Sequence, residues 1–244
     1  MKQAVVFITL ITALCAVVGS LKKEHFFINT SRNWYDAVSF CRSYYTELST
    51  FNSIEEVRDF DDFQTYAGPY WTGLVKWNKN LMFTEDGNWN AVKSMFTVSG
   101  NSGDNSCLFL QQHQATYDSC YTNRPFYCYQ YMRKMIVVNE NKTWDQALDY
   151  CRQNYTDLAS VLTDREMIVA VRRSWGQDQV WIALRFVVKY WLWISGDALE
   201  YEVWSGGQQQ CPVEGYYCGA LSVDNNVWMN QTCDQPLNFI CYQI

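Results

Sequence analysis

The chain contains one stretch twice, and this internal repeat constrains its fold more than any other feature. Residues 143–161, TWDQALDYCRQNYTDLASV, have an earlier copy that begins at Ser31 and reads SRNWYDAVSFCRSYYTELSTF. The offset between Trp34 and Trp144 is 110 residues, and six further identical pairs fall at the same offset. They are Ala37 and Ala147, Cys41 and Cys151, Arg42 and Arg152, Tyr45 and Tyr155, Thr46 and Thr156, and Leu48 and Leu158. Because 244 residues suffice for two domains that each bury a core, we expect two copies of one domain.

Residues 1–20 belong to neither copy and have the features of a secretory signal peptide. Lys2 gives a basic start, residues 4–18 are apolar or small, and Gly19 and Ser20 supply the small residues of a cleavage site. A membrane anchor needs about 20 apolar residues, and this run has 15. The best later candidate for a membrane span, residues 186–194, is short and contains Lys189. We therefore expect a secreted, extracellular protein, and an end three residues after Cys241 fits a complete one.

The charge and histidine content argue against two classes of function. The formal net charge is -6, it becomes -7 without Lys2, and the lysines and arginines are not clustered, so nucleic acid is not an expected partner. His25 and His113 are the only histidines, and neither has the spacing of a metal site or of a nucleophile with its base. We expect no catalytic residues and no enzyme activity.

Nine cysteines remain after the signal peptide, and secretion makes them disulfide candidates. The repeat assigns four to each copy: Cys41, Cys107, Cys120 and Cys128 correspond to Cys151, Cys218, Cys233 and Cys241. Counting alone leaves three pairings open for each set of four. Cys211 is left over as an unpaired thiol, and we hypothesise that it links a fraction of the protein into a covalent dimer.

Each copy is predicted to contain the same order of elements. A short strand at residues 25–29 precedes a helix whose apolar positions begin at Trp34, and a second helix follows a capping box, at Ser53–Glu56 in one copy and Thr163–Glu166 in the other. Aromatic strands start at Trp71 and Trp181, loop-like segments cover residues 97–106 and 205–215, and closing strands cover 126–129 and 239–242. Residues 130–134 are expected to be the linker.

These residues resemble the C-type lectin-like domain family, above all its tandem two-domain secreted forms in fish and the related mannose receptor-like proteins. The resemblance covers residues 25–244 and is carried in each copy by the four cysteines, the helix pair and the strands Trp71-Thr72-Gly73-Leu74 and Trp181-Ile182-Ala183-Leu184. It implies an α+β fold with two domains, 24–130 and 134–244, each with two helices, small antiparallel sheets, a long loop region and two disulfides. The implied bridges are Cys41–Cys128, Cys107–Cys120, Cys151–Cys241 and Cys218–Cys233.

The resemblance also implies a Ca²⁺ site in sugar-binding members, and this sequence lacks its ligand pattern in both copies. The family uses a Glu-Pro-Asn or Gln-Pro-Asp triplet, a Glu before the second of the four cysteines, and Asn-Asp after a Trp. The second copy has no such triplet, Tyr216 stands at the position of the Glu, and Met229-Asn230 stands for Asn-Asp. The first copy has Gly100-Asn101-Ser102-Gly103 and Ala115-Thr116-Tyr117 instead. Since Ca²⁺ prefers oxygen ligands and a thioether is a poor one, we expect no metal cofactor.

Candidate ligand-binding residues therefore come from the loops of the second copy. Tyr216, Tyr217 and Trp228 could form an aromatic patch, with Glu214 and Asn230 beside it, the alternative being that these rings pack over the core. Four glycosylation sequons begin at Asn29, Asn141, Asn154 and Asn230. A glycan at Asn230 would crowd the family's sugar site.

The sequence thus predicts a secreted recognition protein that binds a glycan or glycoprotein ligand other than through the Ca²⁺ site. The alternative is a Ca²⁺-independent protein-binding module without sugar activity, and a structural or transport role is a third interpretation. The missing ligands favour a protein partner, whereas the family favours a glycan.

Overall fold

The structure is a computed structural model that describes residues 21–77, 80–84, 86–100, 106–209, 211–212 and 214–243. The predicted signal peptide lies outside these residues. Residues 23–131 form one compact unit, and the described residues from 132 onward form a second. Among the described segments, no helix is long and apolar enough to cross a bilayer.

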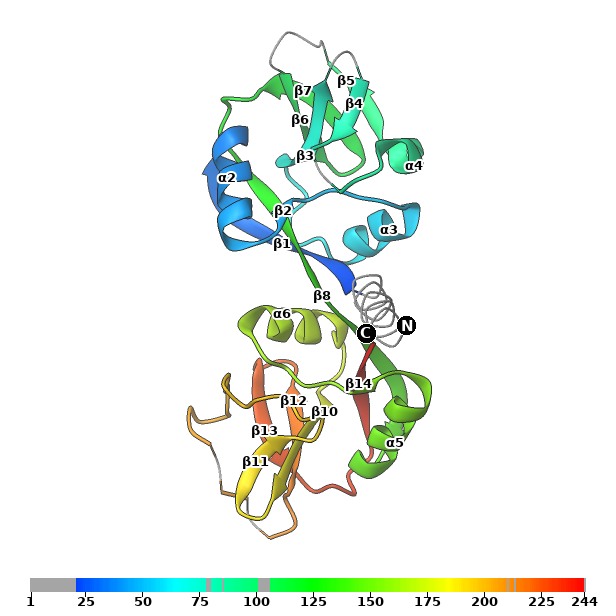
Figure 1. Cartoon of the computed structure of the whole chain (residues 1–244), viewed down its shortest axis with the longest axis vertical. Helices are drawn as coiled ribbons and strands as arrows, with labels where there is room; N and C mark the ends of the chain where they lie inside the picture. The colour runs from blue at the N-terminus through cyan, green and yellow to red at the C-terminus, as the bar shows by residue number, and fades with distance from the viewer. Residues whose placement is uncertain are drawn as a thin grey trace, which may run out of the picture. The chain divides into compact units, whose positions relative to one another are not determined.

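The first domain has two main helices and a sheet built around β3 (Figure 1). Strand β3 pairs with β4 and β6 in antiparallel fashion and with β8 in parallel fashion. Its elements are β1 (Leu21–Arg32), α2 (Trp34–Tyr44), β2 (Glu47–Leu48), α3 (Ile54–Phe63), β3 (Tyr70–Trp77), β4 (Asn80–Phe83), α4 (Trp89–Val92), the 3₁₀ helix η1 (Lys93–Met95), β5 (Thr97–Ser99), β6 (Ser106–Gln111), β7 (Gln114–Ser119) and β8 (Arg124–Lys142).

The second domain repeats this arrangement around β10 (Figure 1). Strand β10 pairs with β11 and β12 in antiparallel fashion and with β14 in parallel fashion. The elements are α5 (Trp144–Asn154), β9 (Asp157–Leu158), α6 (Asp164–Arg173), β10 (Gln179–Val187), β11 (Tyr190–Trp193), β12 (Cys218–Ser222), β13 (Val227–Gln231) and β14 (Leu237–Gln243). The predicted α+β fold with two tandem domains is confirmed, with the addition that a parallel pair joins each antiparallel sheet.

Three sequence-based assignments of local structure differ from the structure. The strand predicted at residues 25–29 is the middle of the longer β1, and residues 97–99, predicted as part of a loop, form β5. The two compact units divide within residues 130–134, where the linker was predicted, but these residues continue strand β8. The part of β8 around Cys128 pairs with β2, and the part beyond Lys134 pairs with β14. Residues 130–134 contain neither Gly nor Pro, so nothing in them breaks a strand.

The helices begin where a side chain caps the first turn, but the predicted capping boxes are only partly formed. Ser53 and Thr163 cap α3 and α6 by accepting from the N–H of Glu56 and Glu166. Each Glu carboxylate, however, accepts from the residue before the cap, Asn52 N–H in one domain and Leu162 N–H in the other. These are caps without the predicted reciprocal bond. A true capping box forms at α5, where Thr143 and Gln146 exchange hydrogen bonds of 3.2 and 3.3 Å.

Trp34, Trp71, Trp144 and Trp181 are buried, and their indole hydrogen bonds repeat between the domains. Trp34 Nε1 donates to the Thr72 carbonyl at 3.1 Å, and Trp144 Nε1 donates to the Ile182 carbonyl at 2.9 Å. Likewise Trp71 and Trp181 donate to the carbonyls at residues 32 and 142. The helix and the strand of each copy are thus locked together by the same pair of indoles.

The disulfides join the same elements in both domains. Cys41–Cys128 and Cys151–Cys241 link the first helix to the last strand across 87 and 90 residues. Cys107–Cys120 and Cys218–Cys233 close loops of 13 and 15 residues. This is the pairing that the resemblance implies. Cys211 is free and exposed.

Candidate functional site

The candidate site of the second domain is the long loop, defined here as residues 194–217 between β11 and β12. It is attached to β13 at its centre, where Trp204 and Trp228 form a parallel bridge. Trp228 N–H donates to the Val203 carbonyl at 2.6 Å, and Ser205 N–H donates to the Trp228 carbonyl at 2.8 Å. The loop is therefore held by backbone hydrogen bonds over a fixed strand.

Four buried tryptophans, three from the strands and one from the loop itself, form an aromatic cluster at the base of the loop: Trp191, Trp193, Trp228 and Trp204. The centroids of Trp193 and Trp228 are 5.0 Å apart in an edge-to-face arrangement, and those of Trp204 and Trp228 are 5.8 Å apart. Trp191 lies 5.0 Å from Trp204. Edge-to-face contacts of this kind stabilise the cluster beyond its burial, so it acts as a rigid base for the loop.

Trp228 is not a surface residue, and the prediction that it contributes to an aromatic ligand patch is wrong. Its side chain is 0% exposed, because the bridge to Trp204 and the neighbouring indoles cover it. Trp228 instead packs over the core of the second domain, which was the alternative interpretation.

The other candidate residues of the patch are accessible. Tyr216 and Tyr217 are 40% and 38% exposed, and Glu214 is exposed. The Tyr217 ring stacks on Phe186 with a centroid distance of 6.2 Å, and Phe186 in turn contacts Trp191. Tyr217 is therefore the solvent-facing end of a chain of rings that leads into the cluster. Asn230 is half-buried on β13, opposite Gly219.

The residues at the positions of the family's Ca²⁺ ligands do not fit that ion. Met229 on β13 is opposite Ala220 and offers a thioether where an amide oxygen is needed. In the first domain Ala115 is buried on β7, and Asp118 is engaged by Arg124. Burial by itself would raise the pKa of Asp118, but hydrogen bonds from Arg124 and the Ser119 N–H lower it.

The described residues contain no cluster of three or more His, Cys, Asp or Glu side chains that could hold a metal ion. Asn101, Asp104, Asn105, Gln210 and Val213 lie outside those residues.

Sequence reasoning missed an exposed apolar tip on the hairpin of β10 and β11. Val188 and Tyr190 are 81% and 72% exposed, and Val187 is the cross-strand partner of Tyr190. Val188 and Lys189 both have positive φ, 48° and 78°, as a two-residue hairpin turn requires. The usual signal for such a turn is Asn-Gly or Asp-Gly, so the Val-Lys pair gave no warning of it.

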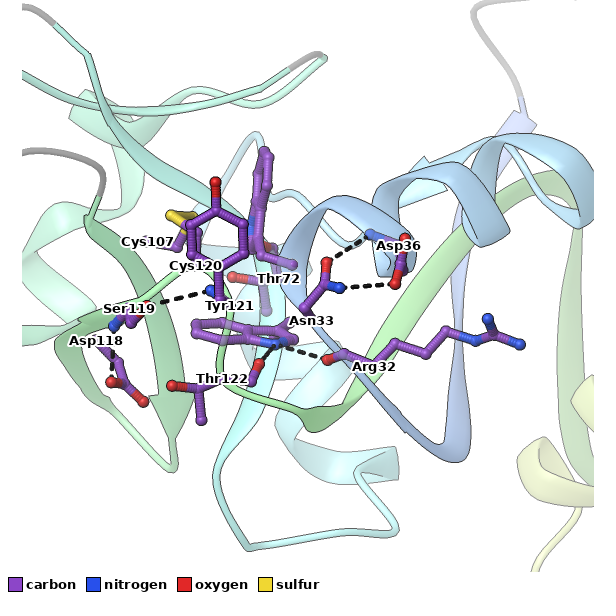
Figure 2. The surroundings of a disulfide bond; sticks show 12 residues. Arg32, Asn33, Asp36, Thr72, Cys107, Asp118, Ser119, Cys120, Tyr121 and Thr122 are labelled. Atoms are coloured by element: carbon purple, nitrogen blue, oxygen red, sulfur yellow. Dashed lines mark hydrogen bonds between the residues drawn. A yellow bond between two sulfur atoms is a disulfide. The ribbon is translucent and has the colours of Figure 1, made fainter.

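A second missed feature is a pair of exposed tyrosines beside the disulfide Cys107–Cys120 of the first domain. Figure 2 shows Tyr121 next to this bridge. Tyr121 is 71% exposed and Tyr35 is 46% exposed, with their centroids 5.7 Å apart. The second copy has Asp145 at the position of Tyr35, so the repeat gave no hint of the pair.

The remaining candidate residues are placed as follows. Asn29, Asn141 and Asn154 are exposed, as glycosylation requires. His113 is exposed and lies 2.7 Å from Asp61 through its Nε2 atom. His25 is buried, with Nδ1 2.9 Å from Ser49 Oγ.

Comparison with known proteins gives matches in both halves of the chain. A family model described as "Lectin C-type domain" matches residues 30–130 and 140–243. Dromaiocalcin-1 of Dromaius novaehollandiae is 29% identical over 123 residues, which is 47% of this chain and 81% of the relative. Rheacalcin-1 of Rhea americana is 31% identical over 124 residues, 47% of this chain and 85% of the relative.

One human relative matches across both domains. Lymphocyte antigen 75 of Homo sapiens is 21% identical over 256 residues, which is 87% of this chain but 14% of that protein. Among solved structures, human lithostathine matches with a TM-score of 0.41 and 25% identity, covering 45% of this chain and 89% of that one.

Proposed function

The chain belongs to the C-type lectin domain family, and from that premise we propose that it is a secreted recognition protein which binds a glycan or glycoprotein ligand without the family's Ca²⁺ site. Recognition is its role, without catalysis and without nucleic acid as a partner. The signal-peptide pattern of residues 1–20 supports secretion.

The composition of the long loop and its supporting strand carries this proposal. Met229 stands on β13 where an oxygen ligand is needed, while Tyr216 and Tyr217 are exposed on the same loop system with Glu214 nearby in sequence. A tyrosine ring can pack against the apolar face of a sugar, and the carboxylate of Glu214 can accept hydrogen bonds from hydroxyls. Recognition of this type needs no metal.

A glycan array probed with and without EDTA tests the proposal. The expected result is binding that persists in EDTA and is lost in the Tyr216→Ala, Tyr217→Ala double variant. Tyr121→Ala is the matched control, because it also removes an exposed tyrosine but lies in the other domain. Hits that disappear in EDTA would contradict the proposal, since they require the metal that Met229 argues against.

A protein ligand is the second candidate, and the apolar hairpin tip favours it. Val187, Val188 and Tyr190 are exposed together, and Phe186 beside them contacts Tyr217. An exposed apolar patch bounded by polar residues is typical of a protein-binding surface. Two results together would favour a protein ligand. The glycan array would give no hits, and the protein would bind enzymatically deglycosylated cells, with this binding abolished by Val188→Asn.

A further inference from the structure

A polar pocket of about 230 Å³ lies in the second domain near the start of β10. The long loop contacts β10 near Phe186, which is seven residues after Gln179 at the start of the strand. Seven residues of extended strand correspond to about 23 Å. We propose that the pocket binds a single sugar ring without a metal ion. The inference rests on the proposed function, glycan recognition, and adds a second sugar site to that of the long loop.

The lining of the pocket is almost entirely polar. Seven residues from β8, β10, β14 and the segments that lead into β10 and β14 contribute to it: Asn141, Gln177, Asp178, Gln179, Gln235, Leu237 and Asn238. Five of them carry an amide, which is both a donor and an acceptor, as a sugar hydroxyl is. The described lining contains no Lys or Arg to attract a phosphate, and Leu237 alone is too little apolar surface for a hydrophobic ligand.

Part of this lining is held in position by hydrogen bonds among the amides. Asn238 Nδ2 donates to Gln177 Oε1, and Gln177 Nε2 donates to Asn139 Oδ1 at 3.4 Å. Gln179 Oε1 accepts from Gln231 Nε2 at 3.0 Å. A preorganised wall lowers the entropy lost when a ligand binds.

The rest of the lining has hydrogen-bonding capacity to spare. Within the described residues, the side chains of Asn141, Asp178 and Gln235 make no hydrogen bond or ion pair with another residue. Each can therefore bond a ligand without first breaking a protein contact. The volume is below the roughly 300–1,000 Å³ of pockets for drug-sized ligands, which suits one ring and not an oligosaccharide.

The first domain shows that the fold does not require these amides. At the offset of 110 residues that relates Trp71 to Trp181, Gln177, Asp178 and Gln179 correspond to Ala67, Gly68 and Pro69. At the offset of 113 residues that relates Phe126 to Phe239, Asn238 corresponds to Pro125. At these four positions the first domain thus folds without an amide, although Ser31 and Thr122, which correspond to Asn141 and Gln235, are polar.

The sugar can come from two sources, and both have the same chemistry. Asn141 begins the sequon Asn141-Lys142-Thr143 and is exposed at the pocket, so the first N-acetylglucosamine of a glycan on this chain would start at the rim. The other source is a glycan on another molecule. Asn141→Gln separates the two, because it removes the attached glycan and keeps an amide.

The test uses saturation-transfer NMR with free N-acetylglucosamine, in EDTA, on the secreted full chain. Asn141→Gln protein is expected to bind the sugar, and adding Gln177→Ala and Asp178→Ala is expected to weaken binding about tenfold or more, since two side chains that bond the sugar are removed. Gln177→Ala copies the first domain's Ala67, and thermal unfolding verifies that the variants fold. Tyr217→Ala is the control, and it should leave this binding unchanged.

The same titration on glycosylated wild-type protein identifies the source. Binding equal to that of Asn141→Gln shows an open pocket for external glycans. The other outcome is that glycosylated wild-type protein does not bind the free sugar, and that peptide N-glycosidase removes its Asn141 glycan more slowly than it does from the Gln177→Ala variant. That outcome shows that the chain's own glycan fills the pocket.

Failure of the pocket and failure of the proposed function give different results. No binding to Asn141→Gln protein, or binding unaffected by the pocket substitutions, overturns the pocket. Neither result affects EDTA-resistant array hits that depend on Tyr216 and Tyr217, so such hits keep the proposed function when the pocket fails.

Discussion

At the scale of single residues, both domains place a positive charge against two carboxylates at the same position of the repeat, buried in the first domain and partly buried in the second. In the first domain Lys23 Nζ lies 3.8 Å from Glu56 and 3.6 Å from Asp86, and 4.6 Å above the Tyr129 ring. Burial lowers the pKa of Lys23, although both carboxylates act in the opposite direction. Paired carboxylates are what make such a buried ammonium tolerable.

The second domain places Arg133 at this position, 110 residues after Lys23. Arg133 bonds both oxygens of Glu166 at 3.2 Å, lies 3.2 Å from Asp197, and stands 4.8 Å from the Tyr242 ring. The cluster is thus repeated part for part. The sequence shows that Lys23 and Arg133, like Glu56 and Glu166, are separated by 110 residues. No pattern in the neighbouring residues, however, indicates that these side chains are removed from solvent.

His25 is expected to make the first domain sensitive to mild acid. Burial lowers its pKa, the nearby charge of Lys23 adds to this, and Glu56, with Oε1 3.7 Å from Nε2, opposes it. Below about pH 6.5 the unfolded chain therefore binds a proton that the folded chain resists, so the free energy of unfolding falls as the pH drops below that value. Urea unfolding between pH 7 and pH 5 measures this loss.

The second domain supplies the control for this prediction. Met135 and Ala159 stand where the first domain has His25 and Ser49. The double variant His25→Met, Ser49→Ala is expected to remove the dependence on pH between 7 and 5. An unchanged pH profile in that variant would show that other groups cause it.

A side chain at Gly73 is predicted to destabilise the first domain unless Thr50 is also changed. A Cβ atom at Gly73 would lie 2.7 Å from the Thr50 methyl and 2.8 Å from Thr84 Oγ1. The second domain has Ala183 at this position and Ser160, without the methyl, in place of Thr50. Gly73→Ala alone is expected to cost about 1–3 kcal/mol of stability through overpacking.

A double-mutant cycle measures the coupling. Adding Thr50→Ser should recover part of the loss, because the hydroxyl that contacts Lys23 and Asp86 is kept and the methyl is removed. Additive costs in thermal unfolding would show that the contact with Thr84 alone excludes the side chain.

At the scale of elements, the long loop depends on one anchor. Trp204 is buried, its Nε1 donates to Glu202 at 2.7 Å, and its backbone bridges to β13. Trp204→Ala is expected to cost about 3–5 kcal/mol, as removal of a buried aromatic side chain does, and to make the loop open to proteases. Limited proteolysis followed by mass spectrometry locates the cleavage.

Trp175→Ala is the matched control for the anchor. Trp175 is the same residue type but is largely exposed, so its loss should change stability by no more than about 0.5 kcal/mol. Equal sensitivity of the two variants would mean that the cluster does not hold the loop.

At the scale of the whole molecule, the two compact units keep one scaffold and differ in their surfaces. Both retain the disulfides, the paired indoles and the charge cluster. Within the residues that the structure describes, the tyrosine pair beside Cys107–Cys120, the apolar tip at Val188 and the amide pocket are each found in one copy. Duplication therefore preserved what folds the domain, and recognition is expected where the copies diverge.

Cys211 is predicted to form a covalent dimer in a fraction of the secreted protein. Its thiol is free and exposed within the long loop, and it has no equivalent among the four cysteines of the first domain. Non-reducing electrophoresis should show a dimer band that Cys211→Ser abolishes. A monomer band alone, unchanged by the substitution, would refute the prediction.

The sequence by itself determined the repeat, the two main helices of each copy and the cap residues Ser53 and Thr163. These features depend on hydrogen bonds within a few residues or on periodic apolar positions, and both are written locally in the chain. The sequence also shows that Met229 offers no oxygen ligand, because this depends only on which residue type is present.

Only the tertiary structure decided which of the remaining side chains meet. Trp228 is buried because residues 203–205 return to β13, and Lys23 is buried because α3 and the segment at Asp86 close over it. The amide pocket joins residues 141, 177–179 and 235–238, which come from three separate segments. Such contacts depend on packing between segments that are far apart in the chain, so no local sequence pattern predicts them.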